Sequence, residues 1–261
     1  MPERLPALFV SHGAPTLPIE AGPARKFLSG LGKAIGRPQA ILAVSAHWEG
    51  IEAEVSAAAH PETIHDFYGF PEELYRMSYP APGAPELAYR VSSLLGAQGI
   101  AVKQHPTRGL DHGAWVPLLL MYPEADIPVT QLTVQTALGT AHHLRLGDAL
   151  RELRDEGVLI LASGGATHNL SEFGRHALDA SPPAWVTDFR NWLAHTIESG
   201  NREDFLRYRE RAPQARRNHP SEEHFLPVYV AAGAGSSGVA GRRIHESNSY
   251  GILAMDAYRF D

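Results

Sequence analysis

Four short runs of mostly apolar and β-branched residues recur along the chain. They cover residues 7–10, 40–44, 129–134 and 158–162. Each run is too short for a typical helix, and strands that lack polar alternation are typical of sheets buried on both faces. We therefore expect four buried strands in a parallel arrangement.

Segments with helical spacing lie between and after these runs. Leu87, Val91 and Leu95 recur at four-residue steps, which places them on one face of a helix over residues 84–95. Similar patterns predict helices at 24–35, 143–154, 185–197 and 221–232. Strands that alternate with helices are typical of the α/β class. We predict a single domain, residues 1–261, with a central, mostly parallel β-sheet flanked by helices.

A Pro- and Gly-rich segment from residue 60 to 85 has little periodicity of either kind. Connectors of this length in compact domains are usually lids or binding loops. His65 lies in it beside several aromatic residues. These aromatic side chains are expected either to fold over an aromatic ligand or to form a small apolar cluster under the loop.

The amino-acid composition excludes several kinds of functional site and partner. The 261 residues include 14 histidines and no cysteine. Disulfides, thiolate zinc sites, iron–sulfur clusters and a cysteine nucleophile are therefore excluded. A net charge of −6 argues against a nucleic-acid partner. No apolar run reaches the roughly 18 residues that span a bilayer, and the first residues lack the apolar stretch of a signal peptide. We expect a cytoplasmic protein with no membrane partner.

Three of the four predicted strands lead directly to a histidine. His12, His47 and His168 follow the first, second and fourth runs. Ligands of an open parallel sheet bind outside the carboxyl ends of its strands. A lone histidine after a strand is more often a hydrogen-bonded loop residue, but three of them indicate a shared metal or acid–base site at this edge.

Two further histidines are candidates for the same site. Ser221 is predicted to be a helix N-cap, which would place His224 in the first turn, where it can reach into a cleft. His112 belongs to a glycine-flanked segment that is either a loop packed by Trp115 or part of the pocket. In the second case Arg108 would meet an anionic substrate.

Imidazole ligands without thiolates favour Zn(II), Fe(II), Ni(II) or Cu(II) over Mg(II) or Ca(II). Zinc would activate a bound water and give a hydrolase. Ferrous iron with open positions would hold an anionic organic substrate and O2 side by side, which would give an oxygenase. The residues alone leave both chemistries open.

An ordered set of motifs resembles the class III extradiol ring-cleavage dioxygenases, and within them the DOPA 4,5-dioxygenase-like branch. The matching motifs are Ser11–Pro15, Ser45–Trp48, Thr63–Phe67, Tyr79–Gly83, Leu110–Trp115, Ala162–Gly164, His168–Leu170 and Pro220–Pro227. No single motif is specific, but together they span nearly the whole chain in the expected order.

The resemblance implies a mononuclear non-haem Fe(II) site with His12, His47 and His224 as ligands, which Zn(II) can also occupy. It implies that the partners are O2 and a small aromatic substrate, DOPA or another substituted catechol. The ring would be cleaved beside its hydroxyls to a muconic semialdehyde, with both oxygen atoms incorporated. His168 would act as the acid–base residue, and His112 would face the oxygen or the substrate.

On the same grounds we expect His65, Trp48 and Asn169 near the substrate. His168 as a fourth ligand and Glu223 as a replacement ligand remain alternatives. For the whole protein the alternatives are a zinc-dependent hydrolase on the same histidines and a non-catalytic binding protein of the same fold. The ring substituent and a homo-oligomeric state are left open, although Arg108 and the arginines between residues 207 and 217 are candidates to pair with a substrate carboxylate.

Overall fold

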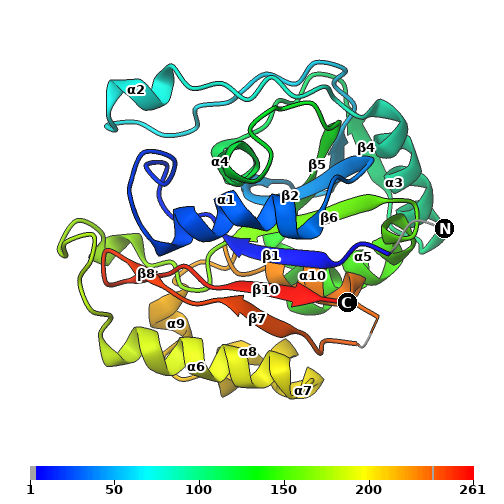
Figure 1. Cartoon of the computed structure of the whole chain (residues 1–261). Coiled ribbons are helices and arrows are strands. Elements are labelled where there is room, and N and C mark those ends of the chain that lie inside the picture. The colour runs from blue at the N-terminus through cyan, green and yellow to red at the C-terminus, as the bar shows by residue number, and fades with distance from the viewer. Residues whose placement is uncertain (1–3, 237) are drawn as a thin grey trace.

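Eight strands form the central sheet of the computed structural model, which describes residues 4–236 and 238–261. These strands are β1 (Ala7–Ser11), β2 (Ala40–Glu49), β3 (Ala53–Ser56), β4 (Val102–His105), β5 (Val129–Val134), β6 (Val158–Gly164), β7 (Arg242–His245) and β10 (Ala257–Phe260). Their order across the sheet is β4-β3-β5-β2-β6-β1-β10-β7 (Figure 1). A separate two-stranded sheet pairs β8 (Asn248–Ser249) with β9 (Leu253–Ala254).

The four runs predicted from the apolar pattern are the four central strands. β5, β2, β6 and β1 lie next to one another, and all three neighbouring pairs are parallel. Every residue of β1, β5 and β6 is buried, as expected for strands covered on both faces. The predicted fold class, an α/β domain with a mostly parallel sheet, is confirmed.

The outer strands carry the antiparallel pairings that the pattern did not predict. β10 runs antiparallel to β1, and β3 runs antiparallel to β5. β3, β4, β7 and β10 are each four residues long. β4 and β7 are also largely polar in sequence. Such short outer strands contain too little apolar periodicity to be recognised without their neighbours.

Helices cover both faces of the sheet (Figure 1). They are α1 (Pro23–Ile35), α2 (Glu72–Tyr75), α3 (Pro85–Ala97), α4 (His112–Met121), α5 (Gly139–Leu150), α6 (Ala184–Glu198), α7 (Arg202–Leu206), α8 (Tyr208–Arg211), α9 (Ala215–Asn218) and α10 (Pro227–Ala234), with short 3-10 turns η1 (Thr136–Leu138), η2 (Arg151–Arg154) and η3 (Leu170–Glu172). α4 packs between α1 and the sheet, and α10 packs between α5 and the sheet. Among the described residues, no helix is both long and apolar enough to cross a membrane.

Two predicted helix boundaries are wrong, and α4 is the longest of several helices that were not predicted. Residues 221–226 form turns, and the helix begins at Pro227, so Ser221 is not an N-cap and His224 precedes the helix. The helix predicted over 143–154 begins at Gly139 and changes to the 3-10 turn η2 after Leu150. α4 is buried on nearly every side and is apolar throughout, so it lacks the amphipathic period by which a helix is recognised.

The long segment predicted to be a functional loop connects β3 to α3 and carries α2; we call it the 57–84 segment. It is drawn in cyan along the top of Figure 1. It is tied to the chain around α4, because the Ile64 N–H donates to the Leu110 carbonyl and the Trp115 indole N–H donates to the Ile64 carbonyl. Leu74 and Tyr79 of the segment are buried in the core.

Candidate active site

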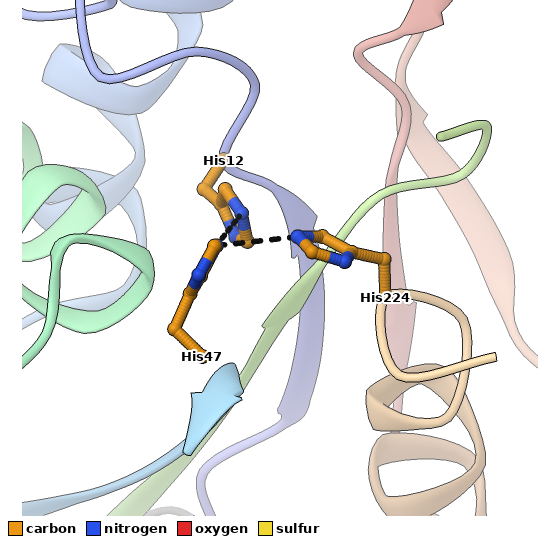
Figure 2. Close-up of side chains that lie close together, drawn as sticks. All are labelled: His12, His47 and His224. Atoms are coloured by element: carbon orange, nitrogen blue, oxygen red, sulfur yellow. Dashed lines mark hydrogen bonds between the residues drawn. The ribbon is translucent and has the colours of Figure 1, made fainter. Parts of the chain in front are cut away.

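Three histidine side chains converge at the carboxyl edge of the central strands (Figure 2). His12 follows β1, His47 lies near the end of β2, and His224 lies in the turns before α10. The Nε2 atom of His47 is 3.1 Å from that of His12 and 3.2 Å from that of His224. Two nitrogens bound to one metal at about 2.0–2.1 Å lie roughly 2.9–3.4 Å apart at octahedral to tetrahedral angles. The spacing fits a shared cation.

A serine fixes the tautomer of His12. Its Nδ1 lies 2.9 Å from the Ser163 hydroxyl oxygen, and the Ser163 hydroxyl itself donates to the Gly113 carbonyl. Since the serine proton is already committed, the oxygen accepts from His12, and the proton of that ring is on Nδ1. The Nε2 lone pair of His12 therefore points toward His47.

Carboxylates fix the tautomers of His47 and His224. His47 Nδ1 lies 3.2 Å from an Asp66 oxygen, and His224 Nδ1 lies 3.0 Å from a Glu223 oxygen. Such partners place the proton on Nδ1 and leave Nε2 free to bind a metal. Three lone pairs facing one another at these distances would repel, so the geometry of the chain suits a cation at their centre.

Burial keeps the three rings in the neutral form that binds metals. It lowers the pKa of His12 and His224 well below the usual value, and neighbouring histidines lower both further. Burial, assisted by His112, lowers the pKa of His47 to about 3. All three rings are thus uncharged at neutral pH.

Two more histidines flank this group. The centroid of the His112 ring lies 3.9 Å from that of His47. The His168 ring stacks on His224 with centroids 3.4 Å apart and an angle of 9° between the planes. Burial, opposed in part by Glu223, lowers the pKa of His168 to about 4. Both rings line the same cavity as the other three histidines.

A cavity of about 300 Å³ opens beside the five histidines. Its other walls are mainly apolar and comprise Gly13, Ala14, Pro15, Asp66, Phe67, Phe70, Leu170, Phe173 and Leu253. This volume is at the lower end of the range for small-molecule sites. Among the described residues, no lysine or arginine lines the cavity. The cavity therefore suits a small, largely apolar ligand.

Gly113 lets the first turn of α4 approach the histidines. A Cβ atom at this position would lie 2.3 Å from the Ser45 hydroxyl oxygen and 2.9 Å from a ring carbon of His47. The same turn is held by Asp111, a buried N-cap that accepts hydrogen bonds from Ser45 at 2.6 Å and from Arg108 at 3.1 Å. A larger residue at 113 would therefore require the Ser45 hydroxyl and the His47 ring to move.

Comparison with known proteins identifies the family to which this arrangement belongs. A family model described as the catalytic LigB subunit of aromatic ring-opening dioxygenase matches residues 6–260. The chain belongs to this family. It is therefore an enzyme of the extradiol ring-cleaving dioxygenase class, and the expected resemblance is confirmed. Membership favours ring cleavage over the zinc hydrolase and the non-catalytic binding protein.

Individual relatives agree over nearly the whole chain. A 4,5-DOPA dioxygenase extradiol from Beta vulgaris is 44% identical over 256 residues, which are 97% of this chain and 95% of the relative. A protein of the same name from Escherichia coli K12 is 40% identical over 234 residues, 88% of this chain and 85% of the relative. The crystal structure of an uncharacterized Escherichia coli K12 protein superposes with a TM-score of 0.83 at 33% identity, covering 99% of this chain and 100% of that one.

Trp48 and Asn169, two of the side chains expected near the substrate, make local packing and capping contacts in this structure. The Trp48 ring packs under the Arg108 guanidinium, 5.0 Å from the ring centroid. Asn169 caps η3, accepting from the Ser171 N–H at 3.1 Å, and its amide donates to the Arg217 carbonyl. Neither side chain belongs to the cavity wall, because hydrogen bonds and stacking orient both toward neighbouring loops.

His65 also lies outside the cavity wall. Its Nε2 lies 3.0 Å from the Met77 carbonyl, and its ring packs against Phe67, Tyr75 and Trp115. The aromatic residues here were expected either to fold over a ligand or to form a small apolar cluster under the loop. His65 belongs to such a cluster. Phe67 and Phe70, by contrast, do line the cavity.

Asp66 and Ser163 lie within two of the motifs that carry the resemblance, but neither was predicted to have a role in the site. Ser163 sits inside a buried strand, and Asp66 follows His65, whose imidazole is the more obvious functional group. An acidic residue in a long aromatic loop was the available signal for Asp66. Glu223, considered above as a replacement ligand, contacts His224 Nδ1 at 3.0 Å in this structure.

Proposed function

We propose that the protein is an Fe(II)-dependent extradiol dioxygenase that opens the ring of a substituted catechol, with His12, His47 and His224 as the ligands. The convergence of three unprotonated Nε2 atoms, each in a ring whose Nδ1 has an acceptor, carries this proposal. Three ligands leave positions open for substrate and oxygen. When bound, ferrous iron would supply the electron transfer that ring cleavage by O2 requires.

His168 and His112 are proposed to manage protons around the bound ring. A catechol hydroxyl must lose its proton on binding, and a proton must return as the ring opens. A neutral imidazole can accept the first proton and return it later. We assign this role to His168, which stacks on one ligand histidine. His112, which flanks a different ligand, is assigned to the side where oxygen binds.

The apolar walls are proposed to hold the rest of the ring and exclude water. Phe67, Phe70 and Phe173 offer aromatic surface to a flat ligand. Among the residues that the structure describes, none of the arginines considered as partners of a substrate carboxylate lines the cavity, and Arg108 and Arg217 pair with Asp111 and Glu172. A substituent that extends from the ring is thus expected to contact apolar side chains rather than a cation.

The test is anaerobic loading with ferrous iron, mixing with a panel of catechols and exposure to air. DOPA, 4-methylcatechol and 3,4-dihydroxybenzoate differ in the charge of the substituent. We expect uptake of O2 in proportion to substrate and a yellow semialdehyde product, with 4-methylcatechol cleaved more efficiently than 3,4-dihydroxybenzoate. The control is the same protein loaded with Zn(II), which is not redox-active. Failure of every catechol to consume oxygen would contradict the proposed function.

A further inference from the structure

Asp66 joins three separate parts of the fold at the candidate metal site. One carboxylate oxygen lies 3.2 Å from His47 Nδ1 and 3.0 Å from His112 Nδ1. The other oxygen accepts the backbone N–H of His112 at 2.9 Å. His47 belongs to β2, His112 begins α4, and Asp66 itself belongs to the 57–84 segment. One carboxylate thus connects that segment to a ligand histidine and to a cavity histidine.

The residues that follow Asp66 form part of the cavity wall. Phe67 and Phe70 line the cavity, whereas Tyr68, between them, is 92% exposed. The segment is held before Asp66 by the Trp115 indole, which donates to the Ile64 carbonyl at 3.0 Å. Asp66 is therefore the polar contact between the metal site and the stretch that supplies this wall.

The His47–Asp66 contact should strengthen when a cation binds. A cation at Nε2 withdraws electron density from the ring and makes the Nδ1 proton a stronger donor. Conversely, a carboxylate at Nδ1 makes Nε2 a better ligand. By thermodynamic reciprocity, whatever the metal adds to this contact, the contact adds to metal affinity.

We propose that Asp66 is a positioning residue that couples metal binding at His47 to the order of the 57–84 segment. The metal strengthens the His47–Asp66 contact, which holds Phe67 and Phe70 against the cavity. Asp66 in turn increases the affinity for the metal and keeps His112 in place. This coupling rests on the proposed metal site.

Glu223 provides a matched comparison within the same site. Its carboxylate lies 3.0 Å from His224 Nδ1, a contact of the same kind as that between Asp66 and His47. Its hydrogen bonds in the described chain are local and link it to Ser221 and His224. Glu223 should therefore support metal affinity in the same way but carry no coupling to the 57–84 segment.

The experiment measures zinc affinity and hydrogen exchange on the full-length protein. Zinc suits this purpose because it binds imidazole nitrogens and requires no turnover. Asp66→Asn and Glu223→Gln keep the shape of each side chain and remove its charge. Both variants are expected to weaken zinc binding by about 10- to 100-fold, as is typical for the partners of ligand histidines.

Hydrogen exchange separates the two variants. Zinc is expected to slow amide exchange over residues 62–78 in the wild-type protein and in Glu223→Gln, but not in Asp66→Asn at saturating zinc. Equal zinc affinity in Asp66→Asn and wild type would overturn the inference and leave the proposed function standing. The inference would also be overturned, with the proposed function left standing, if zinc did not change amide exchange over residues 62–78 in the wild-type protein. This measurement does not depend on the folding of a variant. A wild-type protein that binds no zinc or iron would overturn the metal site and the coupling together.

Discussion

His12 and His143 are both buried histidines whose pKa is lowered by burial, yet they differ in where their nitrogens point. His143 uses both nitrogens locally: Nδ1 lies 2.7 Å from the Gly139 carbonyl, and Nε2 accepts the Gln135 N–H at 3.1 Å. His12 uses only Nδ1 in this way, and its Nε2 faces that of His47. Burial and a low pKa do not distinguish a ligand histidine from a structural one. The distinguishing feature is an Nε2 lone pair that has no hydrogen-bond donor and faces the Nε2 atoms of other histidines.

The largest effect expected from this difference is on metal content. His12→Ala should abolish stoichiometric metal binding and with it ring cleavage, because two nitrogens remain where three converged. His143→Ala should keep the metal but lower the free energy of unfolding by about 2 kcal/mol, because it leaves buried backbone groups without partners. Elemental analysis and urea unfolding of both variants measure this. Full metal occupancy in His12→Ala would show that His12 is not a ligand and does not differ from His143 in this respect.

His168 tests whether stacking on a ligand histidine is distinct from being a ligand. His168→Ala should retain the metal and lower kcat by about 10²- to 10⁴-fold, the usual contribution of a general acid or base. Metal content and single-turnover rates, measured on the same preparation, check this. A variant that loses its metal would show instead that His168 is a fourth ligand.

Gly113 tests how closely α4 must approach the histidines. Gly113→Ala should lower the free energy of unfolding by about 1–3 kcal/mol through overpacking. It should also weaken metal binding, because the added carbon meets Ser45 and His47. Gly96→Ala is the control, since a Cβ there meets no atom within 4 Å and α3 gains a better helix former. Metal titrations and thermal unfolding distinguish the two. Equal behaviour of both variants would show that the first turn of α4 is adaptable.

The structural histidines should make the metal-free protein sensitive to acid. Burial lowers the pKa of His143 to about 4 and that of His219 to about 3, whereas the unfolded chain titrates near 6.5. The unfolded state thus binds more protons below pH 6.5, and stability falls as the pH decreases through this window. The protonation of each histidine in the unfolded state should lower the free energy of unfolding by up to about 2 kcal/mol at pH 5.

Urea unfolding of the metal-free protein at pH 7.5 and pH 5 measures this dependence. His143→Gln, which cannot titrate here, should lose less stability between the two conditions than the wild-type protein. An identical loss in both proteins would show that His143 does not contribute.

The parts of the fold that followed from the sequence are those whose signal is local. β1, β2, β5 and β6 were predictable because strands buried on both faces must be apolar along their whole length. The same logic placed His12 and His47 at one edge of the sheet. His224 was expected at the site from a helix N-terminus, whereas it lies in turns before α10. Its proximity to the site was predicted, but its backbone context was not.

The remaining features depend on contacts between distant segments. β10 becomes a strand by pairing with β1, and the positions of the Trp48 and Asn169 side chains depend on their contacts with Arg108 and Arg217. Asp66 reaches His47 only because the 57–84 segment is tied to the chain around α4. Hydrogen-bond partners separated by many residues leave no periodicity in the sequence, so these features could not be predicted from it.

The sequence by itself determined the fold class, the central strands, the supply of histidines without cysteine and the edge of the sheet where His12 and His47 emerge. Only the tertiary structure decided which ring nitrogens face one another and which carboxylates orient them. Apolar patterns specify burial because the hydrophobic effect depends on area and not on direction. Ligand geometry depends on direction, and direction is set when the Nδ1 atoms of His12, His47 and His224 each find an acceptor.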